Sequence, residues 1–200
     1  MNRRSFRQAL GIGGVFVAAI AFLAYGAEGP HVEHHEGHDH GAAHAEHHTA
    51  SASGLSIPRS LTVEHRELHE QLLKGTKEAG EVGKAASVVA ELLHPHFVKE
   101  EEYALPLLGL LIPAAKGNVP EPHEAIAMAE KLKADLPHML AEHRQIVAAL
   151  DALQKAAKKT DKAEYVHFAD KLRLHAETEE QVLYPAAILV GEYVKLKTTK

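Results

Sequence analysis

Apolar residues recur every three or four positions from Ile57 almost to the C-terminus, which is the spacing of one face of an α-helix. The first stripe runs from Leu61 to Leu72 and predicts a helix that weakens at Gly75 and ends by Gly80. No strand-like alternation interrupts the later stripes. The hydrophobic pattern therefore predicts helices alone for this part of the chain.

The second stripe runs from Val88 to Leu107, past His96 and Tyr103. Pro95 lies within it and predicts a kink or a late helix start near His94. A loop is expected from Pro113 to Pro120, which divides the helical part of the chain into two halves.

The third stripe runs from Met128 to Leu150, and Pro122 suits the first turn of its helix. Pro137 should kink that helix. The fourth helix is expected to begin with Thr160-Asp161 as its cap and to continue past Val182 along one inward stripe. Four amphipathic helices with short or moderate connections predict an all-α fold, an antiparallel up-down four-helix bundle over residues 56–196.

A pattern of polar residues occurs twice within these stripes. Glu64-His65 recurs as Glu142-His143, 78 residues later, and His96-x-x-x-Glu100 recurs as His175-x-x-x-Glu179, 79 residues later. A separation kept over this length indicates that the bundle is built from two copies of one helical hairpin.

The repeated residues have the chemistry of metal ligands. Residues four apart share a helix face, so each His-x-x-x-Glu pair points one way, and His65 and His143 fall within apolar stripes. Burying imidazoles and carboxylates is costly unless something neutralises and organises them. We therefore predict a centre for two transition-metal ions, with iron as the best match. The predicted ligands are His65, His96, Glu100, His143, His175 and Glu179.

Composition narrows the chemistry further. The 200 residues contain no cysteine, which excludes disulfides, iron–sulfur ligation and a thiol nucleophile. The net charge of −5 gives no indication of nucleic-acid binding.

The first quarter of the chain differs from the rest. Residues 1–26 have paired arginines, an uncharged apolar run over residues 9–25 and small residues at the end, which predicts export by a twin-arginine route. The alternatives are an ordinary secretory signal and an uncleaved membrane anchor formed by residues 9–25. Each predicts a periplasmic or other extracytoplasmic protein.

Residues 27–55 form a linker rich in histidine. Eight of the 17 histidines lie between His31 and His48, among few apolar residues, so this segment is expected to be disordered without metal. It is interpreted either as a buffer for transition metals or as a solvated spacer.

The repeated motifs resemble those of the hemerythrin-like family, whose domains are named for a His-His-Glu cation-binding motif. The resemblance covers roughly residues 57–195, and it includes Tyr184-Pro185 beside the predicted ligands. It implies two iron ions joined by two carboxylates and an oxygen-derived bridge. Family members carry oxygen, sense oxygen or redox state, handle nitric oxide or help to repair iron centres.

The chain departs from the oxygen-carrying members of that family. Val147 stands four residues after His143, where those members have a further histidine, and Glu180 replaces their aspartate. His69, four after His65, is a candidate fifth nitrogen ligand or an outer residue. Glu101, Glu142 and Glu180 are candidates for additional ligands or for hydrogen bonds to ligand imidazoles.

Several functions remain open at this stage. The preferred one is reversible binding of O2 or NO, or redox or iron sensing. The alternatives are an enzyme that acts on NO or peroxide or donates iron to damaged centres, and a metal buffer led by the histidine-rich segment. No catalytic residue is assigned.

Overall fold

The computed structural model describes residues 54–199, which form nine consecutive helical segments. The segments are α1 (Arg59–Thr76), α2 (Gly80–Lys99), η1 (Glu100–Ala104), α3 (Leu105–Leu108), α4 (Leu111–Ala115), α5 (Pro122–Lys159), α6 (Ala163–Thr178), η2 (Glu179–Leu183) and α7 (Tyr184–Thr198). The predicted export signal and nearly all of the histidine-rich linker lie outside these residues.

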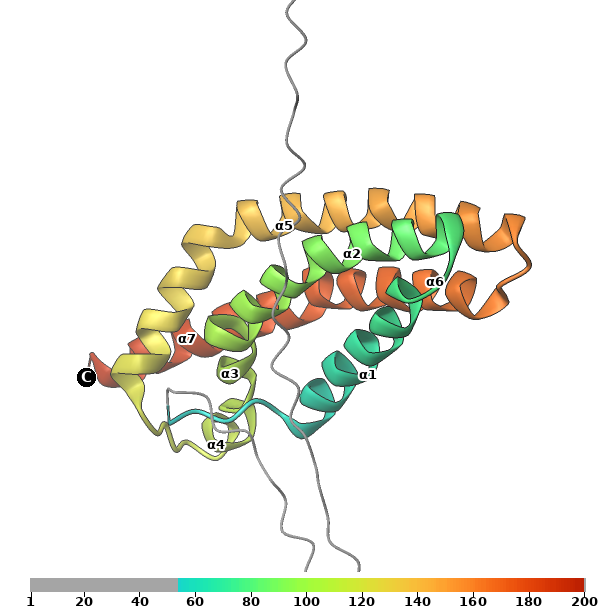
Figure 1. Ribbon diagram of the computed structural model, residues 1–200. Helices are drawn as coiled ribbons and strands as arrows, with labels where there is room; N and C mark the ends of the chain where they lie inside the picture. Colours follow the sequence, from blue (N-terminus) through green and yellow to red (C-terminus); the bar gives the residue numbers. More distant parts are fainter. Residues whose placement is uncertain (1–53, 200) are drawn as a thin grey trace, which may run out of the picture. The chain divides into compact units, whose positions relative to one another are not determined.

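The segments join into four long rods (Figure 1). Helices α1 and α5 are one rod each, and α2–η1–α3 and α6–η2–α7 are the other two. The α2 rod packs against α1 and α5, α5 packs against α6 and α7, and α1 contacts α6. Only a few residues separate α1 from α2 and α5 from α6, so neighbouring rods run antiparallel. The predicted all-α four-helix bundle is confirmed.

Two apolar clusters fill the bundle, one on each side of its middle. The first contains Leu72, Leu93, Leu150 and Phe168. The second cluster lies toward the ends of α2–η1–α3 and α6–η2–α7 and against the first half of α5. It includes Leu107, Leu132, Met139, Tyr184 and Val190. The predicted ligands lie on each rod between the residues of these two clusters, so the middle layer of the bundle is polar.

Several predicted boundaries need correction. Helix α2 begins at Gly80 and includes Pro95, so the expected late start is wrong. Proline removes a single backbone hydrogen bond, and packing against two neighbouring rods offsets that loss. Thr160 does not cap the fourth helix, because its hydroxyl donates to the carbonyl of Ala156 at 2.9 Å and closes α5 instead.

Two expectations from proline are met in part. Helix α5 bends along its length (Figure 1), and Pro137 lies inside it. The loop expected from Pro113 to Pro120 contains the end of the short helix α4 and then a turn.

The π-helical segments η1 and η2 begin at the two predicted glutamate ligands, Glu100 and Glu179. A π-turn holds one more residue than an α-turn, so it moves the inward face of the following residues by one position. Tyr184 is consequently buried and Val182 is 56% exposed. The prediction of an inward Val182 is wrong for this reason.

Close contact between α5 and α7 depends on Gly191, since an added Cβ atom there would lie 2.1 Å from the Cβ of Ala129. We expect Gly191→Ala to lower the free energy of unfolding by about 1–3 kcal/mol through overpacking. Adding Ala129→Gly should restore most of the loss, because the two helix propensities then offset each other. Urea unfolding of both variants is the measurement, and a double variant no more stable than Gly191→Ala would contradict the contact.

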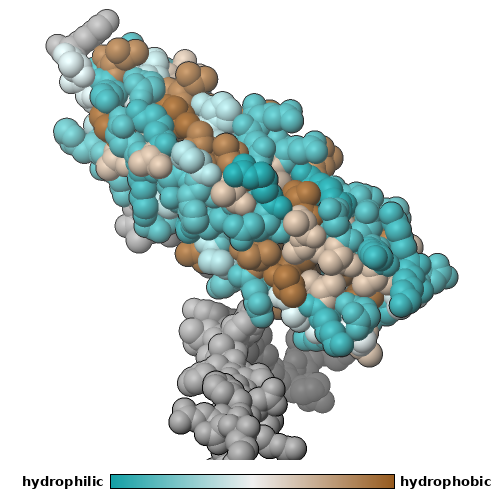
Figure 2. All heavy atoms as spheres, turned by 90° about the horizontal axis from the view of Figure 1, so that it is seen from above, coloured by the Kyte–Doolittle hydropathy of each residue, from teal (hydrophilic) through white to brown (hydrophobic). Residues whose placement is uncertain are grey.

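The surface of the bundle is largely hydrophilic on the face shown in Figure 2, where apolar side chains form a broken band. None of the helices between residues 54 and 199 combines the length and the apolar character that a bilayer crossing requires. The predicted anchor over residues 9–25 lies outside the described residues.

Candidate metal centre

The structure brings all six predicted ligands together in the polar middle layer of the bundle. Glu100 and Glu179 are the first residues of η1 and η2. The four histidines come from α1, α2, α5 and α6, and no member of the set is more than 4% exposed. The six residues are His65, His96, Glu100, His143, His175 and Glu179.

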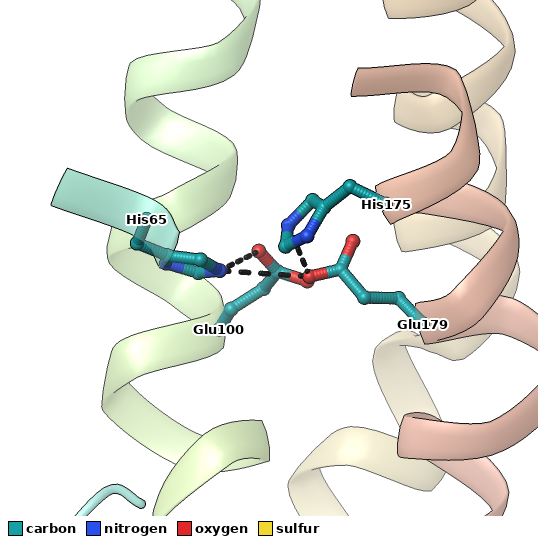
Figure 3. Close-up of side chains that lie close together, drawn as sticks. All are labelled: His65, Glu100, His175 and Glu179. Carbon is teal, nitrogen blue, oxygen red and sulfur yellow. Dashed lines mark ion pairs between the residues drawn. The ribbon is translucent and has the colours of Figure 1, made fainter. Parts of the chain in front are cut away.

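These residues divide into two groups that share both carboxylates. In the first group, Glu100 and Glu179 meet between the imidazoles of His65 and His175 (Figure 3). In the second, the same carboxylates face His96 and His143. Within each group the ligand atoms lie within 4.8 Å of one another. Each group thus offers two imidazole nitrogens and two carboxylate oxygens.

Each carboxylate directs one oxygen to each group. Glu179 Oε1 lies 2.9 Å from His175 Nε2 and 3.6 Å from His65 Nε2, while its Oε2 lies 3.4 Å from His143 Nε2. Glu100 Oε2 lies 3.7 Å from His65 Nε2, and its Oε1 lies 3.5 Å from His96 Nε2. This is the arrangement that two carboxylates bridging a pair of cations would require.

An outer carboxylate faces the Nδ1 atom of every one of these imidazoles. His65 pairs with Glu101 at 3.1 Å, His96 with Glu142 at 3.0 Å and His143 with Glu180 at 2.9 Å. These three glutamates therefore do not belong to the two inner groups. Donation from Nδ1–H leaves the Nε2 lone pair facing inward, which is the form that ligates metal.

The fourth outer carboxylate is Glu64, which lies 3.3 Å from His175 Nδ1 through its Oε1 atom. Sequence reasoning missed it as a site residue. The repeat contained the signal, because Glu64 precedes His65 as Glu142 precedes His143. The outer shell therefore follows the same twofold pattern as the inner residues.

Burial and mutual proximity set the charges in the centre. Complete burial and the neighbouring Glu179 raise the pKa of Glu100. Burial would raise the pKa of Glu179 too, but contacts with His143, His175 and His65 outweigh it and hold that pKa well below its usual range. Burial likewise opposes protonation of His65, yet Glu101, Glu179 and Glu100 raise its pKa to about 9.

Unsatisfied polar atoms show where a cation fits. Within residues 54–199, four buried side-chain atoms form no hydrogen bond and approach one another only as ion pairs: His65 Nε2, Glu100 Oε2, His175 Nε2 and Glu179 Oε1. All four belong to the first group. Buried polar atoms without a partner are costly, and a cation bound to them would remove that cost.

The raised pKa of His65 predicts a pH dependence of the metal-free protein. A histidine pKa of 6.5 in the unfolded chain and about 9 in the folded chain adds stability that is complete below pH 6.5. This contribution, at most about 3 kcal/mol, is lost as the pH rises through 9. Urea unfolding of metal-free protein at pH 6 and pH 9.5 checks it. Equal or greater stability at the higher pH would contradict it.

Tyr184 is a further residue of the centre that sequence reasoning did not single out as a site residue. Its hydroxyl donates to Glu100 and lies 3.4 Å from His96 Nε2 and 3.3 Å from His143 Nε2. The matching position of the first repeat, 79 residues earlier, holds Leu105. The two groups therefore differ: the second has a phenol beside it, whereas Phe97 stacks on His65 in the first.

His69, the candidate fifth nitrogen ligand, belongs to neither of the two groups. His69 is half-buried, with its ring centre 6.0 Å from that of His94. His138 is exposed, and its Nε2 atom lies 2.9 Å from Glu142 Oε1. Tyr103 donates to Asp135 at 2.6 Å and belongs to the second apolar cluster.

Comparison with known proteins agrees with this geometry. The hemerythrin HHE cation-binding domain matches residues 56–187. No curated protein and no solved structure matches the chain. The matched range includes three of the rods, the fourth as far as the start of α7, and both groups of buried histidines and glutamates. The domain implies binding of a metal cation. On this match, the chain belongs to the hemerythrin HHE cation-binding domain family.

Proposed function

We propose that this protein holds two iron ions in the core of the bundle and binds O2 or NO there, as a reversible carrier or as a redox sensor. The observation that carries the proposal is the sharing of Glu100 and Glu179 between two histidine pairs. A site for one ion needs a single group, whereas two groups with common carboxylates suit a bridged pair.

The donor atoms suit iron better than a softer ion. Each group combines two imidazole nitrogens with two carboxylate oxygens, and the chain has no thiolate to offer a softer ion. When bound, a pair of irons supplies reversible redox chemistry and open coordination positions for a diatomic ligand.

The residues of the chain would orient the centre and keep it dry. The outer carboxylates of Glu64, Glu101, Glu142 and Glu180 fix the four imidazole rings. The apolar clusters on either side exclude bulk water, which strengthens electrostatic interactions in the middle layer. The phenol of Tyr184 donates to Glu100 and lies next to the second histidine pair. Once Glu100 holds metal, this O–H group would be free to donate to a ligand bound there.

Tyr184→Phe should therefore leave the iron content unchanged and weaken the binding of the diatomic ligand. Loss of one hydrogen bond predicts about a tenfold lower affinity for O2 or NO. Optical titration with each gas is the measurement. Tyr193→Phe, at a half-buried position on α7, is the matched control. Wild-type gas affinity in Tyr184→Phe would exclude a role for the phenol in ligand binding.

We further propose that the protein acts after export from the cytoplasm. The proposal is supported by the paired arginines and the uncharged apolar run of residues 1–26. Fractionation of cells that express the full chain tests it, since the bundle should be recovered outside the cytoplasm and should remain inside after Arg3→Lys with Arg4→Lys.

Gas binding and catalysis are separated by one experiment on reduced, iron-loaded protein. A binding protein should gain an optical band on addition of O2 or NO and lose it when the gas is removed. An enzyme should instead consume NO or peroxide well beyond one molecule per centre when an electron donor is supplied. Steady consumption would replace the proposed function with the enzymatic alternative.

A further inference from the structure

A surface pocket of about 360 Å³ opens between α1 and α2 beside the first histidine pair. Its lining includes His65 and Glu101, together with His69, His94 and Phe97. His65 is a predicted ligand, and its ring therefore forms part of the wall between this pocket and the centre. The pocket therefore reaches from the surface to one residue of the first group.

His69 and His94 give this pocket the chemistry of a metal-binding site. Their ring centres are 6.0 Å apart, and two imidazoles on one ion reach up to roughly 6.5 Å when each metal–nitrogen bond is about 2.1 Å. Burial and the nearby His94 lower the pKa of His69, which favours the neutral, ligating form. Water would complete the coordination of a weakly held ion.

Glu101 links the two histidines to the centre. Its side chain is 48% exposed, and its Oε1 atom accepts a hydrogen bond from His65 Nδ1. A carboxylate in this place attracts a cation into the pocket. The positive charge of Arg66, which also lines the pocket, is partly offset by Glu70 at 4.0 Å.

The pair formed by His69 and His94 is not repeated in the second half of the bundle. The positions that match His69 and His94 in the second half hold Val147 and Arg173. Arg173 forms structural ion pairs there with Asp151 at 2.7 Å and Asp170 at 3.1 Å. The ligands of the centre are duplicated and His69 and His94 are not, so these two histidines are a feature of one side of the bundle alone.

We propose that His69 and His94 form a transient loading site for a divalent transition metal. The captured ion then moves past Glu101 and His65 into the centre. This inference rests on the proposed function, because it requires a core that takes up iron. A loading site speeds uptake and release by the same factor and leaves the affinity of the core unchanged.

The test compares three full-length, metal-free proteins: the wild type, His69→Gln with His94→Gln, and His123→Gln with His167→Gln. The last variant removes two exposed imidazoles elsewhere on the bundle. The histidine-rich segment is the same in all three. Each protein receives ferrous iron in excess over two ions per chain, without oxygen. Iron in the core is measured at intervals as the iron that survives a brief chelator wash. Release is followed from loaded protein in a strong chelator.

In His69→Gln with His94→Gln we expect uptake and release both to slow by about tenfold, with two irons at the end point and an unchanged optical spectrum. The control variant should match the wild type. Wild-type rates in the first variant, equal slowing in the control, or a lower end point with unchanged rates would overturn the loading site. A wild type that acquires no chelator-resistant iron would instead refute the proposed function, and the loading site with it.

Discussion

Glu100→Gln is expected to abolish stable binding of both metal ions rather than of one. Glu100 directs Oε2 toward His65 and Oε1 toward His96, so the substitution removes a charged donor from both groups at once. An amide nearly preserves the volume of the side chain but cannot bridge two cations through two anionic oxygens. Loss of an outer hydrogen-bond partner typically lowers the affinity for metal by about 10–100-fold. Loss of a carboxylate shared by both groups should lower it further.

Elemental analysis after equilibration with ferrous iron measures this effect. Glu102→Gln is the matched control, since Glu102 lies two residues away on η1 and is paired at the surface with Lys131 at 2.6 Å. The control should retain two irons per chain in the core. A full complement of iron in Glu100→Gln would show that the carboxylate does not bridge.

His65→Ala with His175→Ala should have a different result, a fall from two irons to one. These histidines belong to the first group alone, and the second keeps His96, His143 and both carboxylates. Removing two of four donors from one position should lower its affinity by well over about 100-fold, while the other position keeps all of its side-chain ligands. Iron content together with electron paramagnetic resonance checks the count and shows whether the remaining iron is unpaired.

His69→Ala with His94→Ala is the control for this variant, because it removes two imidazoles outside both groups. It should keep two irons once loading is complete. Loss of both irons from His65→Ala with His175→Ala would mean that the positions are filled together, and retention of both would exclude these two histidines as ligands.

The repeat in the sequence was sufficient to predict which residues meet in the core. Four-residue spacing on a helix fixes a shared face, so His96 with Glu100 and His175 with Glu179 had to point the same way. The 78- and 79-residue separations made the two halves equivalent. The outer position of Glu64 was contained in the same repeat and was overlooked.

Other features depend on contacts that the hydrophobic pattern does not contain. The π-turns at Glu100 and Glu179 shift the helix face by one residue, so an unbroken helical period placed Val182 inward instead of Tyr184. The division of the ligands into two groups depends on how each carboxylate is turned between the rods. The twofold symmetry also suggested His69 as a ligand, whereas the packing of α1 on α2 places it beside His94.

A binuclear iron centre in the bundle can be tested most directly by Mössbauer spectroscopy of the full chain loaded with iron-57, combined with iron and protein analysis. We expect two irons per chain that form one magnetically coupled pair, in addition to any iron held by the histidine-rich segment. The pair should persist when residues 31–48 are deleted. A spectrum of isolated iron ions alone, or loss of all iron with that deletion, would contradict a binuclear centre in the bundle.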